Sequence, residues 1–176
     1  MTRLSRADLG EQFRTFRRSA VRLETRDTYV VENERDPFRR FRSGEMDDLR
    51  WFRPWAATVQ ARVDCGARIA RVRLVGDPPS DYVRWEMWLT PHNEAAGEEI
   101  RFLLASRAAD LHLPGYDYWI FDGERLVLMY FAPDGVPQGG ELITDPSIVA
   151  SHRRWYELAR ASSQSLTEYQ AGSVGG

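Results

Sequence analysis

The segment from Ser80 to Trp88 concentrates the polar and aromatic side chains best suited to hold a ligand. If it is helical, Tyr82 and Glu86 lie one turn apart on one face, while the tryptophans share another. One hypothesis is that Tyr82, Arg84 and Glu86 line a small-molecule or peptide pocket with tryptophan walls. The alternative is a buried aromatic anchor with an internal ion pair between Arg84 and Glu86.

Asp117 and Asp122 are a second candidate pair, because two carboxyl groups can serve as a general acid and a general base. Their odd separation places them on opposite faces of a regular strand, which argues against a shared active site. A hydrolase or a nucleic-acid-processing toxin that uses acidic residues and arginine remains the alternative function.

Several kinds of catalytic or metal-binding site require residues, or a spacing of residues, that the sequence does not have. All 24 basic residues are arginine, which excludes Schiff-base enzymes, Walker-type phosphate loops and Ser-Lys hydrolases. The three histidines lack the spacing of metal ligands, and Cys65 is the only cysteine. No Gly-x-Ser-x-Gly elbow is present, which weakens the case for a Ser-His-Asp hydrolase. The sequence therefore predicts neither a metal site nor a cofactor.

Charge is divided between the two halves of the chain. Met1 to Arg73 holds 17 arginines and 11 acids, a net charge of +6, whereas the remainder holds 7 arginines and 15 acids, a net charge of −8. This asymmetry predicts either a surface for nucleic acid or an acidic protein, or attraction between the two halves. The basic residues that could form such a surface, or simply a solvated face, are Arg14, Arg17, Arg18, Arg39, Arg40 and Arg42.

The first 50 residues should be largely helical. Ser5 and Asp8 have the spacing of a capping box, and an apolar stripe follows at helical spacing through Leu9, Phe13, Phe16 and Ala20. Thr28 to Val31 predicts a short strand, and Glu34 to Arg42 predicts a helix that ends at Gly44.

Two helix-strand units should follow. The first has a helix that opens at Arg53-Pro54, a C-terminal glycine at Gly66 and a strand over Arg68–Val75, which alternates as a half-buried strand does. The second has a helix from Ser80 to Trp88, a turn from Thr90-Pro91 to Gly97 and a strand over Ile100–Ala105. We expect the two strands to be parallel neighbours joined by a right-handed crossover.

The last third should begin with a short helix around Ser106–Leu111. Three antiparallel strands are then predicted at Tyr116–Asp122, Arg125–Phe131 and Gly140–Thr144, with turns at Asp122-Gly123 and Asp134-Gly135. Asp145-Pro146 should start a long final helix. Together these elements predict an α/β (α+β) fold with a mixed sheet, two helix-strand units, an antiparallel meander and a long C-terminal helix.

The chain should form a single domain over residues 1–170, with an N-terminal helical part at about 1–50, a core at about 53–170 and a disordered tail at 171–176. No segment has the length and apolar character of a membrane-spanning helix or a signal peptide. We therefore expect a cytoplasmic protein that does not bind a membrane.

The order of elements from Trp55 to Asp145 resembles one half of a phospholipase D-like domain. In that family, the hairpin after the second helix-strand unit carries His-x-Lys-x-x-x-x-Asp. With Asp122 at the final position, Gly115 occupies the histidine place and Asp117 the lysine place. An aspartate there would repel phosphate, so the resemblance implies the scaffold without the phosphodiesterase chemistry.

The chain also resembles an uncharacterised actinobacterial family whose members are often encoded beside helix-turn-helix regulators. The resemblance lies in Ser19–Thr25, Gly66–Val75, Ser80–Glu86, Gly97–Arg101, Asp117–Asp122 and Glu141–Pro146. It implies a non-catalytic regulatory module that binds a helix-turn-helix transcription regulator or a related protein, with nucleic acid contacted directly or through that partner. Direct nucleic-acid binding is the third alternative.

Overall fold

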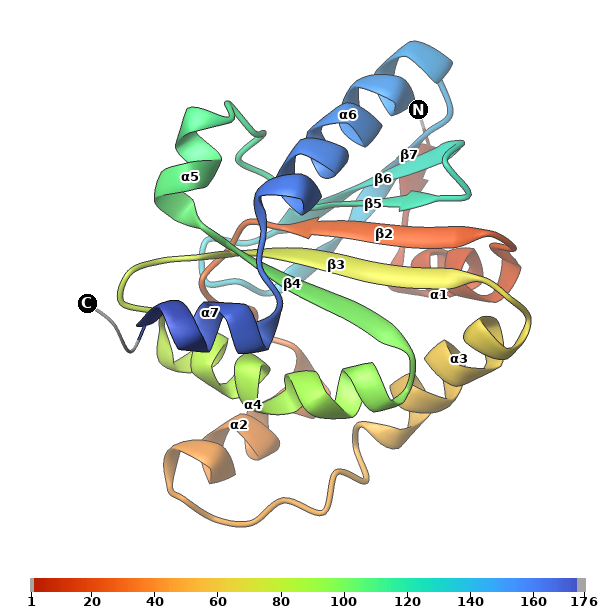
Figure 1. Cartoon of the computed structure of the whole chain (residues 1–176). Coiled ribbons are helices and arrows are strands. Elements are labelled where there is room, and N and C mark those ends of the chain that lie inside the picture. Colours follow the sequence, from red (N-terminus) through yellow and green to blue (C-terminus); the bar gives the residue numbers. More distant parts are fainter. Residues whose placement is uncertain (1, 174–176) are drawn as a thin grey trace.

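A seven-stranded mixed sheet with the strand order β1-β7-β6-β5-β2-β3-β4 organises the chain (Figure 1). The structure is a computed structural model that describes residues 2–173. The strands are β1 (Thr2–Leu4), β2 (Ser19–Glu24), β3 (Arg68–Val75), β4 (Glu98–Leu104), β5 (Tyr118–Phe121), β6 (Arg125–Phe131) and β7 (Pro137–Ile143). Strands β2, β3 and β4 are mutually parallel, and all other neighbouring pairs are antiparallel.

Helices cover both faces of this sheet (Figure 1). They are α1 (Arg6–Thr15), the short 3₁₀ helix η1 (Glu32–Glu34), α2 (Arg35–Arg42), α3 (Arg53–Asp64), α4 (Asp81–Ala95), α5 (Ala105–Asp110), α6 (Pro146–Ser162) and α7 (Leu166–Ser173). Helices α5 and α6 pack on one face, and α1, α3 and α4 pack on the other. The described residues thus form a single mixed α/β domain, as predicted. None of its helices is both long and apolar enough to cross a membrane.

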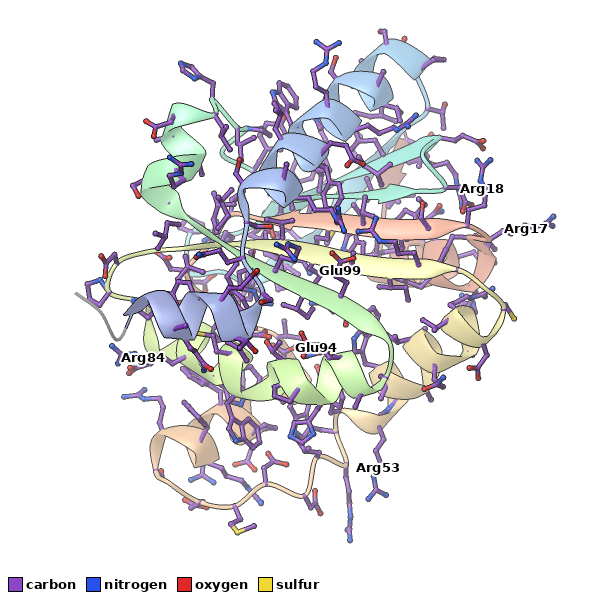
Figure 2. All side chains as sticks on the ribbon, viewed as in Figure 1. Arg17, Arg18, Arg53, Arg84, Glu94 and Glu99 are labelled. Carbon is purple, nitrogen blue, oxygen red and sulfur yellow. The ribbon has the colours of Figure 1, made fainter. Side chains whose placement is uncertain are left out.

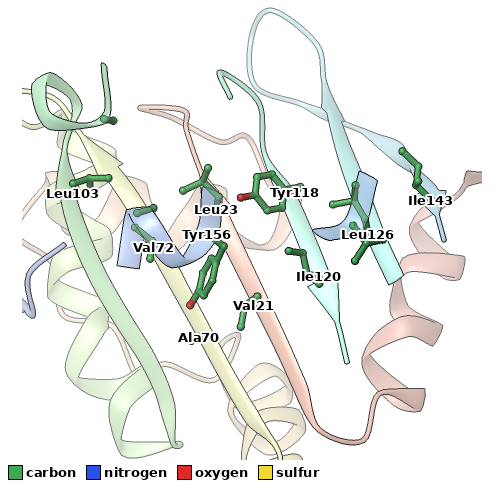
Figure 3. Close-up of a cluster of buried hydrophobic side chains, with 13 residues drawn as sticks. Val21, Leu23, Ala70, Val72, Leu103, Tyr118, Ile120, Leu126, Ile143 and Tyr156 are labelled. Carbon is green, nitrogen blue, oxygen red and sulfur yellow. The ribbon is translucent and has the colours of Figure 1, made fainter. Parts of the chain in front are cut away.

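The face under α5 and α6 is almost entirely apolar. Val21 and Leu23 of β2 meet Val72 of β3 and Ile120 of β5 there, and Tyr156 of α6 packs over them (Figure 3). Because side chains alternate across a strand, the residues between these positions point to the opposite face. In β2 and β3 those residues include charged side chains, which build the site described below.

Several local signals act as predicted. The side chain of Ser5 accepts from the backbone of Asp8 while the Asp8 carboxylate accepts from the backbone of Ser5, which completes the capping box of α1. Gly66 follows α3 with a φ of 82°, the left-handed conformation that glycine adopts without strain. Asp145 caps α6. Strands β3 and β4 are parallel neighbours, as the two helix-strand units predict.

Between Phe16 and Val31 the predictions were wrong. Helix α1 ends at Thr15, and Ala20 lies in β2, which was not predicted. The predicted strand at Thr28–Val31 is absent: this segment pairs with no strand of the described residues, and the N–H of Val30 donates a 3.0 Å hydrogen bond to the carbonyl of Gly135. Because β2 contains charged residues, its sequence does not resemble that of a strand in the centre of a sheet, although β2 occupies such a position.

Two helix boundaries also differ from the predictions. Helix α4 continues through Pro91 to Ala95, because the buried residues Leu89 and Asn93 on either side of the proline anchor it to the core and offset the lost backbone hydrogen bond. The long final helix ends at Ser162, where Gln164 forms two 2.8 Å backbone hydrogen bonds with Phe102 at the edge of β4. Helix α7 then reaches Ser173, inside the segment predicted to be disordered; residues 174–176 lie outside the described residues.

Candidate ligand-binding cleft

The register of β2 and β3 brings four charged residues together on the sheet face opposite α5 and α6. Arg22 lies directly beside Arg71, and Glu24 lies beside Arg73. Both pairs alternate with apolar residues that point into the other core, so the pleat of the two strands fixes the charged side chains on one side. All four are buried or nearly so, with side-chain exposures of 13% for Arg22, 15% for Arg71, 3% for Arg73 and 2% for Glu24.

Glu24 is the centre of this group because three arginines reach its carboxylate. Arg22 approaches at 2.9 Å, Arg73 at 2.6 Å and Arg71 at 3.4 Å. Burial by itself would raise the pKa of Glu24, but the three guanidinium groups lower it to about 2. Glu24 therefore stays ionised at neutral pH.

Each of the three arginines also holds a second carboxylate. Arg22 pairs with Asp117 at 3.0 Å, Arg73 pairs with Glu86 at 2.8 Å, and Arg71 pairs with Glu98. Residues from strands β2, β3 and β4, from α4 and from the position just before β5 are thus joined in one network of buried ion pairs. Removing one member of such a network leaves an uncompensated buried charge, which makes the arrangement rigid.

Next to this network lies an open cleft with two adjacent lobes of about 310 and 340 Å³. The lobes share eight lining residues, which are Leu9, Phe13, Arg22, Val31, Glu34, Arg71, Glu86 and Met129. We call this the arginine–glutamate cleft. Its lobes lie at the lower end of the volumes usual for small-molecule sites, and four of the eight shared residues are charged.

Aromatic rings form much of the wall of the second lobe. Trp51, Phe52, Trp55 and Trp119 line it together with Phe13. The guanidinium of Arg71 lies 5.0 Å from the centroid of the Trp55 ring, and that of Arg22 lies 5.5 Å from the Trp119 ring. These distances allow cation–π attraction and hold both arginines against the aromatic wall.

Glu34 differs from the other carboxylates of the cleft because it forms no ion pair among residues 2–173. The hydroxyl of Tyr82 donates a 2.8 Å hydrogen bond to its carboxylate. Burial and then the negative charge of Glu86 raise the pKa of Glu34 to about 7, although Tyr82 and the nearest arginines act in the opposite direction. Glu34 therefore exchanges its proton near neutral pH.

The cleft contains two of the three residues predicted on the Ser80–Trp88 segment. Tyr82 and Glu86 line it, whereas Arg84 lies on the outward side of α4, where it pairs with Asp81 at 3.4 Å (Figure 2). The expected ion pair between Arg84 and Glu86 is wrong, since Glu86 pairs with Arg73. Trp85 is a buried anchor, as the alternative predicts.

The two predicted basic groups lie apart. Arg14 lies at the end of α1, and Arg17 and Arg18 lie just before β2 (Figure 2), whereas Arg39, Arg40 and Arg42 lie on α2 (Figure 1). Most of these side chains already meet an acid, such as Glu124 for Arg18 and Asp36 for Arg40. Six arginines of the first half pair with acids of the second, which are Arg18, Arg22, Arg42, Arg68, Arg71 and Arg73. The division of charge therefore contributes to contacts between the two halves.

Asp117 and Asp122 lie in different environments. Asp117 is buried and accepts hydrogen bonds from Arg22, Thr25 and Tyr29. Asp122 accepts from the backbone N–H groups of residues 17–19 and so fixes the turn that leads into β2. The two carboxylates do not share a site, in agreement with their odd separation.

Most of the charged residues of the cleft and of the ion-pair network beside it were not predicted from the sequence. These are Arg22, Glu24, Glu34, Arg71, Arg73 and Glu98. A signal existed, because Arg71 and Arg73 stand two positions apart within a predicted strand, as do Arg22 and Glu24 in a segment with apolar neighbours. Charged residues at a spacing of two between buried positions share one face of a strand, and here that face is buried.

The chain belongs to the family described as a domain of unknown function (DUF6879), which matches residues 7–171. No curated protein is significantly similar to it. Its structure resembles that of TrmBL2, described as an archaeal chromatin protein with a novel mode of DNA binding, with a TM-score of 0.54 and 12% sequence identity. The match covers 93% of this chain and 53% of TrmBL2, so the chain spans about half the length of that protein. At this identity the likeness concerns the fold.

Proposed function

We propose that this domain is a non-catalytic regulatory module that binds a small ligand in the arginine–glutamate cleft and acts with a helix-turn-helix transcription regulator. The observation that carries the proposal is the cleft itself, where ionisable groups from η1, β2, β3 and α4 converge beside an aromatic wall. A buried, pre-organised polar centre next to apolar walls is the usual form of a ligand site.

The charged groups of the cleft favour binding over catalysis. Each of the three arginines is held between two carboxylates, so none is free to stabilise a developing anion as a catalytic arginine does. If the chain retains a phospholipase D-like scaffold, Asp117 stands at the lysine place of that motif, where its carboxylate binds Arg22, Thr25 and Tyr29. The position would then serve the ion-pair network.

The regulatory part of the proposal rests on two associations. The resemblance to an actinobacterial family encoded beside helix-turn-helix regulators suggests a partner of that class and a cytoplasmic location. TrmBL2 is a protein that binds DNA, and about half of it matches this chain in fold. A domain of this fold can therefore belong to a DNA-binding assembly, and in our proposal the partner supplies the DNA contacts.

Co-purification tests the partnership. The domain would be expressed with a helix-turn-helix regulator from the same organism, and the complex measured at micromolar concentration with and without DNA. Absence of a complex under both conditions contradicts the regulatory proposal. Binding of the isolated domain to DNA with a steep salt dependence would instead support direct nucleic-acid recognition.

Charge reversal locates the partner surface. One variant would replace Arg39, Arg40 and Arg42 by Glu, and a second would replace Arg14, Arg17 and Arg18. Arg107→Glu with Arg154→Glu is the control, because both residues are exposed and lie outside the two basic groups. If an acidic partner docks on one group, only the variant of that group loses the complex.

A further inference from the structure

The ion pairs of the cleft do not balance its charge. Three arginines, Arg22, Arg71 and Arg73, face four carboxylates, which are Glu24, Glu86, Glu98 and Asp117. This set already carries one net negative charge before Glu34 is counted. Buried charge without a partner is costly, so a bound group of opposite sign stabilises such a site.

Glu34 adds to this excess negative charge and lines the open cleft. The charged and titratable groups that face it are Tyr82 and Glu86 of α4 and Arg71 and Arg73 of β3. Both arginines are already engaged by other carboxylates, at 2.8 Å between Arg73 and Glu86 and by two contacts between Arg71 and Glu98. An N–H donor that enters the cleft would find Glu34 and Glu86 on the same wall.

An anionic ligand fits this site less well. Arg22 and Arg71 line both lobes, but each is bonded to two carboxylates of the protein. The Nε of Arg22 has no hydrogen-bond partner among the described residues but is buried, and a carboxylate or phosphate that reached the arginines would lie close to Glu34 and Glu86. Like charges at such short range repel strongly in a buried site.

The second lobe suits the body of a cationic ligand. The rings of Trp51, Phe52, Trp55 and Trp119 form much of its wall. Aromatic faces attract cations and pack well against a flat apolar group. The polar centre and this wall are adjacent, since the two lobes share Arg22, Arg71, Glu34 and Glu86.

We infer that the arginine–glutamate cleft accepts a small organic cation, an amine or amidine, whose N–H groups bond to Glu34 and Glu86 while its apolar body occupies the aromatic lobe. This inference rests on the proposed ligand-binding function of the cleft and specifies the chemical class of its ligand. Replacement of the Glu34 proton by the ligand cation makes binding release a proton near neutral pH.

Calorimetry with three planar probes of similar shape tests the inference. Benzamidinium is cationic, benzamide is neutral and benzoate is anionic. At pH 8 the account predicts that benzamidinium binds at least about tenfold more tightly than the other two. Glu34→Gln should weaken benzamidinium binding by about tenfold or more, whereas Glu32→Gln, an exposed neighbour on the same 3₁₀ helix, should leave it unchanged.

A second measurement needs no variant. Benzamidinium titrations of the unaltered domain at pH 7, in buffers of different ionisation heat, should show proton release, and affinity should fall as the pH is lowered to 6 because Glu34 becomes protonated. Absence of proton release together with pH-independent affinity contradicts the inference.

The remaining outcomes separate this inference from the proposed function. Preferential binding of benzoate or benzamide overturns the cation assignment but leaves the cleft as a ligand site. Failure of all three probes at millimolar concentration overturns the cation assignment, and the co-purification experiment then decides independently whether the regulatory proposal survives. Equal benzamidinium affinities for Glu34→Gln and Glu32→Gln also overturn it, since the cation then binds elsewhere.

Discussion

The hydroxyl of Tyr82 donates a 2.8 Å hydrogen bond to the carboxylate of Glu34 and thereby ties α4 to the 3₁₀ helix η1. One turn later on α4, Glu86 holds Arg73 of β3 at 2.8 Å. The two contacts place one paired and one unpaired carboxylate on the same wall of the cleft. The effects of these contacts on the free energy of unfolding and on the pKa of Glu34 can be measured separately.

The first prediction concerns the pH dependence of stability. The pKa of Glu34 is about 7 in the folded state, against an ordinary value of 4.5. Between these values the folded state binds more protons than the unfolded chain, so stability falls as the pH rises from about 4.5 to 7. Glu34 can account for a loss of up to about 3 kcal/mol over this range. Urea unfolding at pH 5 and pH 7.5 should show that Glu34→Gln removes this loss.

The comparison requires Glu32→Gln as a control, because other groups titrate in the same range. Burial lowers the pKa of His152 below its ordinary 6.5, and this makes stability rise with pH in that window. Glu24, with a folded pKa of about 2, contributes stability that is lost only as the pH falls below about 4.5. The difference in the free energy of unfolding between Glu34→Gln and Glu32→Gln at each pH gives the contribution of Glu34 alone. Identical pH profiles for these two variants would contradict the prediction.

The second prediction concerns the ion-pair network. Arg73→Ala leaves Glu24 and Glu86 without one shared cation in a buried site, so we expect a loss of about 3 to 5 kcal/mol in the free energy of unfolding. Arg84 lies on the exposed side of α4. Arg84→Ala should lower the free energy of unfolding by less than about 0.5 kcal/mol, because it removes only an exposed contact with Asp81. Chemical denaturation of both variants gives the two values, and equal losses would rule out the buried network.

The third prediction separates structural from catalytic roles of Asp122. Asp122→Ala removes acceptors from the backbone N–H groups of residues 17–19 and from Arg125, so it should destabilise the protein by about 2 to 3 kcal/mol. Glu124→Ala is the nearby exposed control and should have a small effect. If expression of the domain is toxic and Asp122→Ala relieves the toxicity with unchanged stability, the toxin alternative gains support over the module proposed here.

Much of the fold could be predicted because its signals are local. The capping box at Ser5, the glycine at Gly66 and the Asp145-Pro146 start of α6 each depend on a few neighbouring residues. Strand β2 could not be found in the same way, because Arg22 and Glu24 resemble a solvent-exposed face until β3 and β5 are placed beside them. The continuation of α4 through Pro91 likewise depends on burial against the sheet, a tertiary effect that overrides local propensity.

The residues of the candidate site likewise divide into those that a local sequence pattern could identify and those that only the folded structure shows. Tyr82 and Glu86 could be selected because their spacing places them on one helix face, but Arg84 was selected with them by proximity alone. Glu34 lies 48 positions from Tyr82 in the sequence, and no local pattern links the two. Only the folded structure shows that Glu34 lacks the arginine that each neighbouring carboxylate has.

A fourth prediction follows from the same hydrogen bond. Tyr82→Phe removes the donor that favours the ionised form of Glu34, so the pKa of Glu34 should rise further. Tyr130→Phe, which removes an exposed hydrogen bond to Glu141, is the matched control and should leave the pKa of Glu34 unchanged. Carboxyl ¹³C chemical shifts measured across the pH range report both effects.

The pKa of Glu34 shows most directly whether the cleft holds an uncompensated carboxylate. In protein labelled with ¹³C at glutamate side-chain carboxyls, the Glu34 resonance is identified by its loss in Glu34→Gln and then followed from pH 3 to pH 9. We expect a midpoint of about 7, which falls when benzamidinium is added. A midpoint near the ordinary 4.5, unchanged by benzamidinium, would contradict the claim that the cleft holds an uncompensated carboxylate.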